Sequence, residues 1–203
     1  MSAERLIVFV RAPQEGAVKT RLAATLGAPA ALVAYQRLLT TVCNHLDSLP
    51  PSSVEFRHTP DDAGIQLSPW MRRGWACEPQ GSGSLGKRLE RATADAFSSG
   101  VQRLVLIGSD CPDLTASDIQ SAWNALHVHD VVLGPAEDGG YWAIGLRAPV
   151  PEVFRDIPWS TPSVLETTLD RCRTLKLSTK TLRQLRDVDT QADWEAWLQR
   201  AAP

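Results

Sequence analysis

Short runs of consecutive apolar residues alternate along this chain with longer stretches in which apolar residues recur every three or four positions. The first run covers residues 6–10, and another covers residues 104–107. A strand buried on both faces of a parallel sheet has this continuous pattern. The stretch at residues 30–46 has the periodicity of an amphipathic helix. The alternation predicts an α/β fold in three layers, with a mostly parallel central sheet and helices on both faces.

Further elements follow from periodicity and from turn residues. Additional helices are predicted over residues 85–96, 115–126 and 164–172. Additional strands are predicted over residues 54–58, 131–133 and 141–146, the last two joined by a turn at 137–140. In the first of these, Val54, Phe56 and His58 alternate with their neighbours, as in a strand with one buried face. Residues 187–189 are expected to end a short strand, and Thr190 is expected to begin the last helix, with Asp193 three residues on.

Composition excludes several classes of protein. Lys and Arg total 21 against 23 Asp and Glu, so no positive surplus drives binding to nucleic acid. The four cysteines are far apart and the histidines lack zinc-finger spacing, which argues against a structural zinc site and a secreted disulfide framework. No stretch approaches the roughly 18 apolar residues of a membrane span. We expect one cytoplasmic domain over residues 1–203, a monomer or homodimer bound to neither nucleic acid nor membrane.

Ligands of such folds bind beyond the carboxyl ends of the strands, so the loops that follow the apolar runs are the candidate site. The loop after the first run carries Arg11, Gly16, Lys19 and Arg21 and leads into a helix. Cationic side chains near a helix N-terminus favour phosphate binding. The alternative is a basic turn exposed to solvent. No nucleotide-binding glycine motif of the Walker or dinucleotide type is present in this loop.

Acidic residues follow two other predicted strands. Asp110 lies in the loop that follows the run at residues 104–107, and Asp189 belongs to the motif Asp-Val-Asp-Thr at residues 187–190. Carboxylates at strand ends are suitable ligands for Mg²⁺ or Mn²⁺. Asp113 is better explained as the start of a turn. Asp110 and Asp189 are therefore the candidate metal ligands.

The loop at residues 134–142 combines glycines, acids and aromatic residues. Glu137 or Asp138 has the chemistry to deprotonate an acceptor hydroxyl. Aromatic faces stack on sugars or bases, so an acceptor or sugar site is predicted at Gly139, Gly140 and Tyr141, and at Trp159 in a later Trp-Ser-Thr segment. The alternatives are a plain Asp-Gly hairpin turn and a tryptophan of the core.

A glycine-rich loop at residues 80–89 precedes the predicted helix at 85–96. Its residues Ser84, Leu85 and Gly86 are candidates for contact with a base or ribose. A flexible connection without a ligand explains the same composition equally well.

Six ordered motifs extend over nearly the whole chain. They are P-x-x-G-x-V-K-T-R-L, G-x-L-G-x-R, I-G-S-D-C-P-D-L, G-P-A-E-D-G-G-Y, I-P-W-S-T and D-V-D-T. In this order they resemble the GT-A-fold nucleotide-diphospho-sugar transferase-like proteins labelled arsenosugar-biosynthesis glycosyltransferases. More distantly, the chain is similar to molybdenum-cofactor and phospholactate guanylyltransferases and to CMP-Kdo synthetase. The resemblance implies a Rossmann-like GT-A domain in which Lys19 and Arg21 hold nucleotide phosphates, Asp110 binds a divalent metal and Asp189 is a second candidate ligand.

The expected activity is a metal-dependent transfer from a nucleotide-activated donor, with Mg²⁺ or Mn²⁺ as cofactor. Transfer of a glycosyl group from a nucleoside-diphosphate sugar to a small-molecule acceptor is the first hypothesis. The alternative is nucleotidyl transfer that releases pyrophosphate from a nucleoside triphosphate, although the first loop lacks the G-G-x-[ST]-x-R pattern common in nucleotidyltransferases. A nucleotide-binding protein without catalysis is a third hypothesis.

Overall fold

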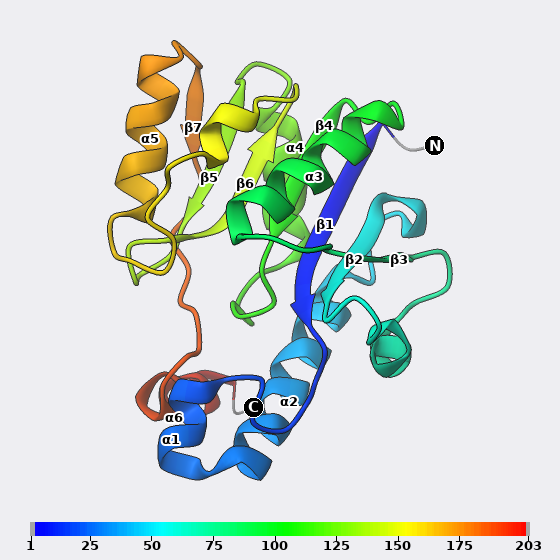
Figure 1. Ribbon diagram of the computed structural model, residues 1–203, viewed down its shortest axis with the longest axis vertical. Helices are drawn as coiled ribbons and strands as arrows, with labels where there is room; N and C mark the ends of the chain where they lie inside the picture. The colour runs from blue at the N-terminus through cyan, green and yellow to red at the C-terminus, as the bar shows by residue number, and fades with distance from the viewer. Residues whose placement is uncertain (1–2, 202–203) are drawn as a thin grey trace.

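A seven-stranded sheet runs through the computed structural model, which describes residues 3–201 (Figure 1). The strand order is β3-β2-β1-β4-β6-β5-β7, and only β6 runs against its neighbours. The strands are β1 (Glu4–Arg11), β2 (Val54–Thr59), β3 (Ala76–Pro79), β4 (Arg103–Ile107), β5 (Val131–Pro135), β6 (Tyr141–Leu146) and β7 (Thr179–Thr181). The mostly parallel sheet that the apolar runs predicted is confirmed.

Helices cover both faces of the sheet. They are α1 (Thr20–Leu26), α2 (Ala28–Leu46), α3 (Leu85–Ser98), α4 (Ala116–Ala125), α5 (Val164–Thr174) and α6 (Gln191–Ala201), with 3₁₀ turns η1 (Pro51–Ser53), η2 (Gly64–Trp70) and η3 (Pro151–Phe154). None of the helices within residues 3–201 is long and apolar enough to cross a lipid bilayer.

Alternate residues of β1 point into two separate cores, as expected for a strand between two helix layers. Leu6 and Val8 pack in the same cluster as Trp123 of α4. Ile7 packs in the other cluster, with Leu89 of α3 and Cys172 of α5. All six side chains are at most 6% exposed. The predicted three-layer arrangement is therefore confirmed.

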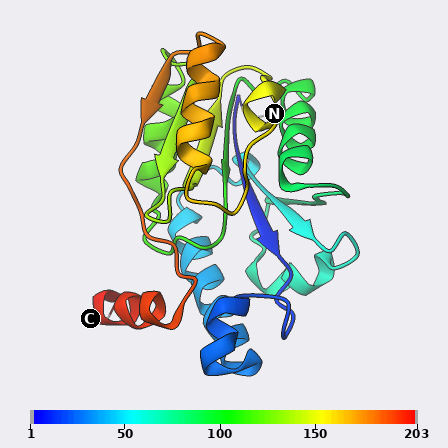
Figure 2. The same ribbon diagram turned by 60° about the vertical axis from the view of Figure 1, so that its left-hand side comes forward.

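Helices α1 and α6 lie beyond the end of the sheet at which β1 ends, and both views show them there (Figures 1 and 2). The two helices contact each other, and Trp194 of α6 packs beside Leu22 of α1. The guanidinium of Arg37 on α2 lies 5.9 Å from the ring centroid of Trp194 and 5.3 Å from that of Trp197. Apolar and cation–π contacts thus attach the C-terminal helix to the edge where the candidate loops gather.

Two local expectations were wrong. Residues 54–58 do not alternate in exposure, because β2 is an interior strand and Glu55 and Arg57 are buried as well. Their charges are compensated by Arg5, whose Nη1 lies 2.6 Å from Glu55 Oε2, and by Asp95, whose Oδ2 lies 3.0 Å from Arg57 Nη1. Residues 187–189 lie outside any strand, because β7 ends at Thr181.

The expected start of the last helix is confirmed, since the backbone N–H of Thr190 donates to Asp193 Oδ2 at 2.8 Å ahead of α6. The first loop leads into a helix as predicted, and this helix is α1. It is a short helix separated from α2 by Gly27 alone, whose φ of 82° lies in the region that favours glycine.

Replacing Phe56 with alanine should remove a fully buried ring from the core beneath β2. The ring is 0% exposed and lies 5.5 Å from the ring of Trp75, measured between centroids. We expect Phe56→Ala to lower the free energy of unfolding by about 3–5 kcal/mol, measured in urea. The control Val33→Ala, at a side chain that is 65% exposed, should change it by less than about 0.5 kcal/mol. A loss below about 1 kcal/mol for Phe56→Ala would contradict the packing described here.

Candidate active site

The buried ammonium group of Lys19 joins three segments that are far apart in the sequence. Lys19 directly precedes α1 in a left-handed conformation with φ of 46°, and its side chain is only 4% exposed. The Nζ atom forms an ion pair with Asp110, which follows β4. It also lies 3.0 Å from Oδ1 of Asp189, which precedes α6. The predicted phosphate-binding lysine and both predicted metal ligands therefore meet at one point.

Electrostatics keep this lysine charged. Burial by itself lowers the pKa of Lys19, but the negative charges and hydrogen bonds of Asp110 and Asp189 outweigh burial and raise the pKa above its ordinary value. Arg21 adds a second cation, with Nη1 3.7 Å from Asp189 Oδ2, and its side chain is 69% exposed. The guanidinium of Arg21 thus remains accessible to a ligand.

A polar cavity of about 570 Å³ opens beside Lys19. We name it the cation-lined cavity, because Arg11, Lys19, Arg21 and Arg88 all border it. Arg88 is held in place by hydrogen bonds from Nε to the carbonyl oxygen of Gly83 at 2.9 Å and from Nη1 to Gln80 Oε1 at 3.3 Å. Four fixed positive groups around one space suit a ligand with several phosphate charges.

Only some of the other predicted phosphate- and nucleotide-binding residues line the cation-lined cavity. Leu85 lines the cation-lined cavity, whereas Gly16, Ser84 and Gly86 do not. Ser84 caps α3 by accepting a hydrogen bond from the N–H of Lys87 at 3.5 Å. Gly86 packs closely against Trp159, and Gly16 faces open space. Arg88 was absent from the predicted set, although the G-x-L-G-x-R motif contains it.

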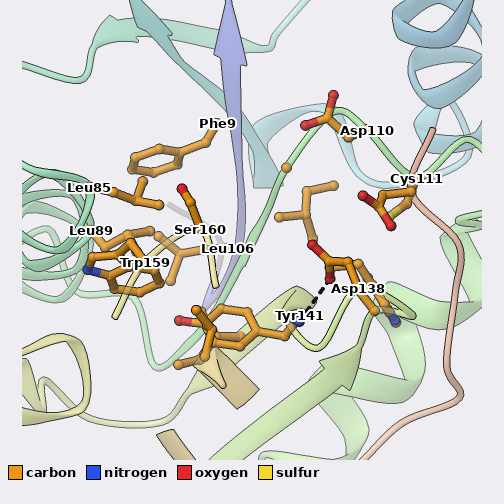
Figure 3. A pocket seen from close by; sticks show the side chains of 18 of the residues that line it. Phe9, Leu85, Leu89, Leu106, Asp110, Cys111, Asp138, Tyr141, Trp159 and Ser160 are labelled. Atoms are coloured by element: carbon orange, nitrogen blue, oxygen red, sulfur yellow. Dashed lines mark hydrogen bonds between the residues drawn. The ribbon is translucent and has the colours of Figure 1, made fainter. Parts of the chain in front are cut away.

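A second cavity of about 330 Å³ adjoins the first (Figure 3). We name it the apolar cavity, because rings and aliphatic side chains form much of its wall. Figure 3 shows Phe9, Leu85, Leu89 and Trp159 gathered on one side and Asp110, Cys111 and Asp138 on the other. The two cavities share six lining residues: Phe9, Leu85, Gly108, Asp110, Ser160 and Asp189.

The loop between β5 and β6 is both a hairpin turn and part of the cavity wall. The strands it joins are antiparallel, as the hairpin interpretation required, yet Asp138 and Gly140 line the apolar cavity. Asp138 Oδ1 accepts a hydrogen bond from the N–H of Gly140 at 2.8 Å, which orients the carboxylate. Glu137 lines neither cavity and forms an ion pair with Arg186 at 2.7 Å between Oε1 and Nε. The structure brings only one of the two predicted bases to the cavity.

The predicted acceptor or sugar residues lie close together. Tyr141 and Trp159 line the apolar cavity and meet edge to face, with ring centroids 6.2 Å apart. Gly139 does not line it, and its φ of 87° and the contact with Pro162 leave no room for a Cβ atom. Its carbonyl oxygen accepts a hydrogen bond from the N–H of Leu165 at 3.0 Å, so the hairpin turn is attached to the start of α5.

Asp187 lines the apolar cavity although it was not among the predicted site residues. Burial and the nearby charges of Asp138 and Asp189 raise the pKa of its carboxyl group to about 6. The sequence could have indicated this residue, because Asp187 lies only two residues before the predicted site residue Asp189. Negative charge is therefore concentrated at this side of the cavity.

Asp110 and Asp189 fit a metal that is shared with a phosphate ligand. Their side chains are 48% and 35% exposed, so their oxygens are accessible from the cavities. Within residues 3–201, no group of three or more His, Cys, Asp or Glu side chains is arranged to hold a metal ion. Mg²⁺ needs no such group, because it is commonly bound by one or two carboxylates, substrate phosphates and water.

The seven-stranded, mostly parallel sheet with helices on both faces defines an α/β protein with a Rossmann-like fold. The chain belongs to the family described as "Uncharacterized protein conserved in bacteria (DUF2064)", which matches residues 42–161. A protein of Desulfovibrio desulfuricans G20, provisionally described as a nucleotide-diphospho-sugar transferase, shares 32% sequence identity with a TM-score of 0.91, over 98% of this chain and 88% of that one. The relationship that the ordered motifs predicted is confirmed.

Two more distant structures share the fold. The 4-diphosphocytidyl-2C-methyl-D-erythritol synthase of Anaerococcus prevotii DSM 20548 has 11% identity and a TM-score of 0.63, over 98% of this chain and 97% of that one. CMP:2-keto-3-deoxy-manno-octonic acid synthetase complexed with CTP has 10% identity and a TM-score of 0.59, over 99% and 100%. No curated protein matches the sequence.

The thiol of Cys111 should be unreactive despite lining the apolar cavity. It is 7% exposed, and burial together with Asp110 and Asp187 raises its pKa well above the ordinary value. We expect iodoacetamide at pH 8 to label the less buried Cys77 before Cys111, as followed by peptide mass spectrometry. Protein unfolded in urea, in which all four thiols should react, is the control. Labelling of Cys111 first would show that this side of the cavity is more open than described.

Proposed function

We propose that this protein transfers a glycosyl group from a nucleoside-diphosphate sugar to the hydroxyl group of a small acceptor. The observation that carries the proposal is the pair of cavities that meet at Asp110 and Asp189, one lined by cations and the other containing a candidate base. The Desulfovibrio relative, provisionally described as a nucleotide-diphospho-sugar transferase, supports the broader assignment to transferases that use nucleotide-activated donors.

The donor is assigned to the cation-lined cavity. Arg11, Lys19 and Arg21 would bind the diphosphate, since their charges are opposite to those that develop on the leaving group. Two opposite unit charges about 4 Å apart interact by about 4 kcal/mol at an effective dielectric constant of about 20. A few such contacts that strengthen as the diphosphate departs account for several powers of ten in rate.

Asp110 and Asp189 would hold the divalent metal. When bound, Mg²⁺ or Mn²⁺ supplies Lewis-acid stabilisation of the negative charge on the diphosphate. Lys19, whose ammonium group lies between these two carboxylates, keeps them at the shared wall of the cavities. The protein thus provides both the ligands and the positive side chain that fixes their position.

Asp138 is the proposed general base in the apolar cavity. Because its Oδ1 accepts the Gly140 hydrogen bond, we assign Oδ2 to the acceptor hydroxyl. In the reaction the bond from the anomeric carbon to the diphosphate oxygen breaks, and the electron pair leaves with the nucleoside diphosphate. The acceptor oxygen bonds to that carbon while its proton passes to Asp138.

A calorimetric titration panel, with and without Mn²⁺, tests the class of donor. The proposal predicts that UDP- or GDP-sugars bind with metal-dependent preference over GTP and CTP. Tighter binding of a triphosphate would favour nucleotidyl transfer and direct the work to a pyrophosphate-release assay. Absence of binding by every nucleotide would contradict the proposal as a whole.

Removing the carboxylate of Asp110 should abolish metal-dependent turnover without unfolding the protein. We expect Asp110→Ala to slow release of nucleoside diphosphate from the bound nucleotide sugar at least about 100-fold. The matched control is Asp113→Ala, because Asp113 follows three residues later, lines neither cavity and pairs with Arg200 at 3.1 Å. Unchanged turnover of Asp110→Ala, with metal binding intact, would refute the assignment.

Paired substitutions distinguish which of the two neighbouring acids of the hairpin turn is the general base. We expect Asp138→Asn to lower kcat by a factor of about 10²–10⁴, which is the usual contribution of a general base. Glu137→Gln should change kcat less than threefold, since Glu137 points to Arg186 instead of the cavity. The reverse order of effects, measured on the same donor, would transfer the role of base to Glu137.

A further inference from the structure

We infer that the acceptor is a small uncharged alcohol with a cyclic or aromatic apolar body, held against Phe9, Leu85 and Trp159 with its hydroxyl group toward Asp138. This inference rests on the proposed function and specifies the class of acceptor. Three observations carry it: the composition of the cavity wall, the fixed position of its aromatic corner, and the distribution of charge.

The wall of the apolar cavity is assembled from five parts of the fold. Apolar side chains come from β1, α3, β4, β6 and α5, namely Phe9, Leu85, Leu89, Leu106, Ile144 and Val164. A cavity of about 330 Å³ is at the lower end of the range for small-molecule sites, so its ligand is small. Burying an apolar group there is favourable by about 25 cal/mol per Å², whereas a polyol would lose hydrogen bonds to water along this wall.

Leu85 is a part of this wall that is exposed to solvent. It is 42% exposed at the first residue of α3. The other large hydrophobic side chains that are exposed in the described part of the chain, Val33, Ile65 and Val128, line neither cavity. A ligand in the apolar cavity would therefore cover the exposed leucine that borders the site.

The aromatic corner is held in place before any ligand arrives. Trp159 meets Tyr141 at an interplanar angle of 78°. It also packs against Gly86, where a Cβ atom would come within 3.0 Å of the indole nitrogen. The backbone N–H of Trp159 donates to the carbonyl oxygen of Ile157 at 2.8 Å. A ring fixed in this way offers a flat apolar surface without an entropic cost of ordering it.

Charge at the opposite side of the cavity limits what the acceptor can carry. Asp138 and Asp187 line this cavity together with Asp110 and Asp189, whose charges are balanced by Lys19. An acceptor with a carboxylate or phosphate next to its hydroxyl would meet the like charges of Asp138 and Asp187 there. An uncharged alcohol avoids this repulsion and can donate its hydroxyl proton to a carboxylate.

Three probes separate the features of the proposed acceptor. Benzyl alcohol carries an apolar ring and a hydroxyl, glycerol carries hydroxyls alone, and mandelate adds a carboxylate beside the hydroxyl of a ring compound. We expect amide chemical-shift titrations of the whole chain, with UDP present, to give a Kd for benzyl alcohol at least tenfold lower than for glycerol or mandelate. The largest shifts should come from Phe9, Leu85 and the indole N–H of Trp159.

Leu85→Asp should weaken benzyl alcohol binding at least tenfold, because it places a charge on the apolar wall. An aspartate at the first turn of a helix is compatible with folding, which thermal unfolding would verify. The matched control Val33→Asp alters an exposed apolar residue of α2 away from both cavities, and it should leave the Kd unchanged.

Equal affinities for benzyl alcohol and glycerol, or insensitivity to Leu85→Asp, would overturn the inference. UDP binding is measured separately, so the proposed nucleotide donor and the proposed class of acceptor are tested independently. UDP binding without preference for benzyl alcohol would overturn the acceptor class alone. Benzyl alcohol binding without binding of any nucleotide would overturn the proposed function and, with it, the role of this alcohol as acceptor.

Discussion

The ion pairs of Lys19 with Asp110 and Asp189 determine how the loops at one edge of the sheet are arranged. A buried ammonium group without partners would lose its proton or draw water into the site. Here the two carboxylates supply the compensating charge and keep it protonated. One partner follows β4, and the other precedes α6. The first loop, the loop after β4 and the C-terminal segment are therefore positioned by one charge cluster.

The topology explains why remote segments reach this cluster. Strands β1 and β4 are parallel neighbours, so the loops that contain Lys19 and Asp110 leave the sheet at the same edge. Strand β5 runs in the same direction as β4, because β6 lies antiparallel between them. The turn after β5 consequently brings Asp138 to that edge. A single sheet edge thus borders both cavities.

Much of this arrangement was predictable from the chain. Continuous apolar runs identified β1 and β4, and the rule that ligands bind beyond strand ends identified Lys19 and Asp110 as candidates. The sequence also contained the start of α6, since Thr190 and Asp193 have capping spacing. These features depend on residues close together in the chain, where periodicity and turn chemistry act directly.

Features that depend on tertiary contacts were not predictable. Val188 was expected at the end of a short strand, but its N–H donates to the carbonyl oxygen of Asp110 at 3.0 Å instead of to a strand neighbour. Glu137 and Asp138 are adjacent in sequence, yet in the tight turn Glu137 pairs with Arg186 and Asp138 lines the apolar cavity. Phe9 belongs to an apolar run that looks like core throughout, and only the fold shows that it also lines both cavities.

In the proposed reaction a donor phosphate and an acceptor meet where the two cavities share Asp110 and Asp189. Paramagnetic broadening of backbone amide signals by Mn²⁺, recorded with and without UDP, tests it most directly. We expect UDP to strengthen broadening centred on residues 108–111 and 187–189. Broadening centred on other acidic residues, such as Asp61 and Asp62 after β2, or broadening that UDP leaves unchanged, would contradict it.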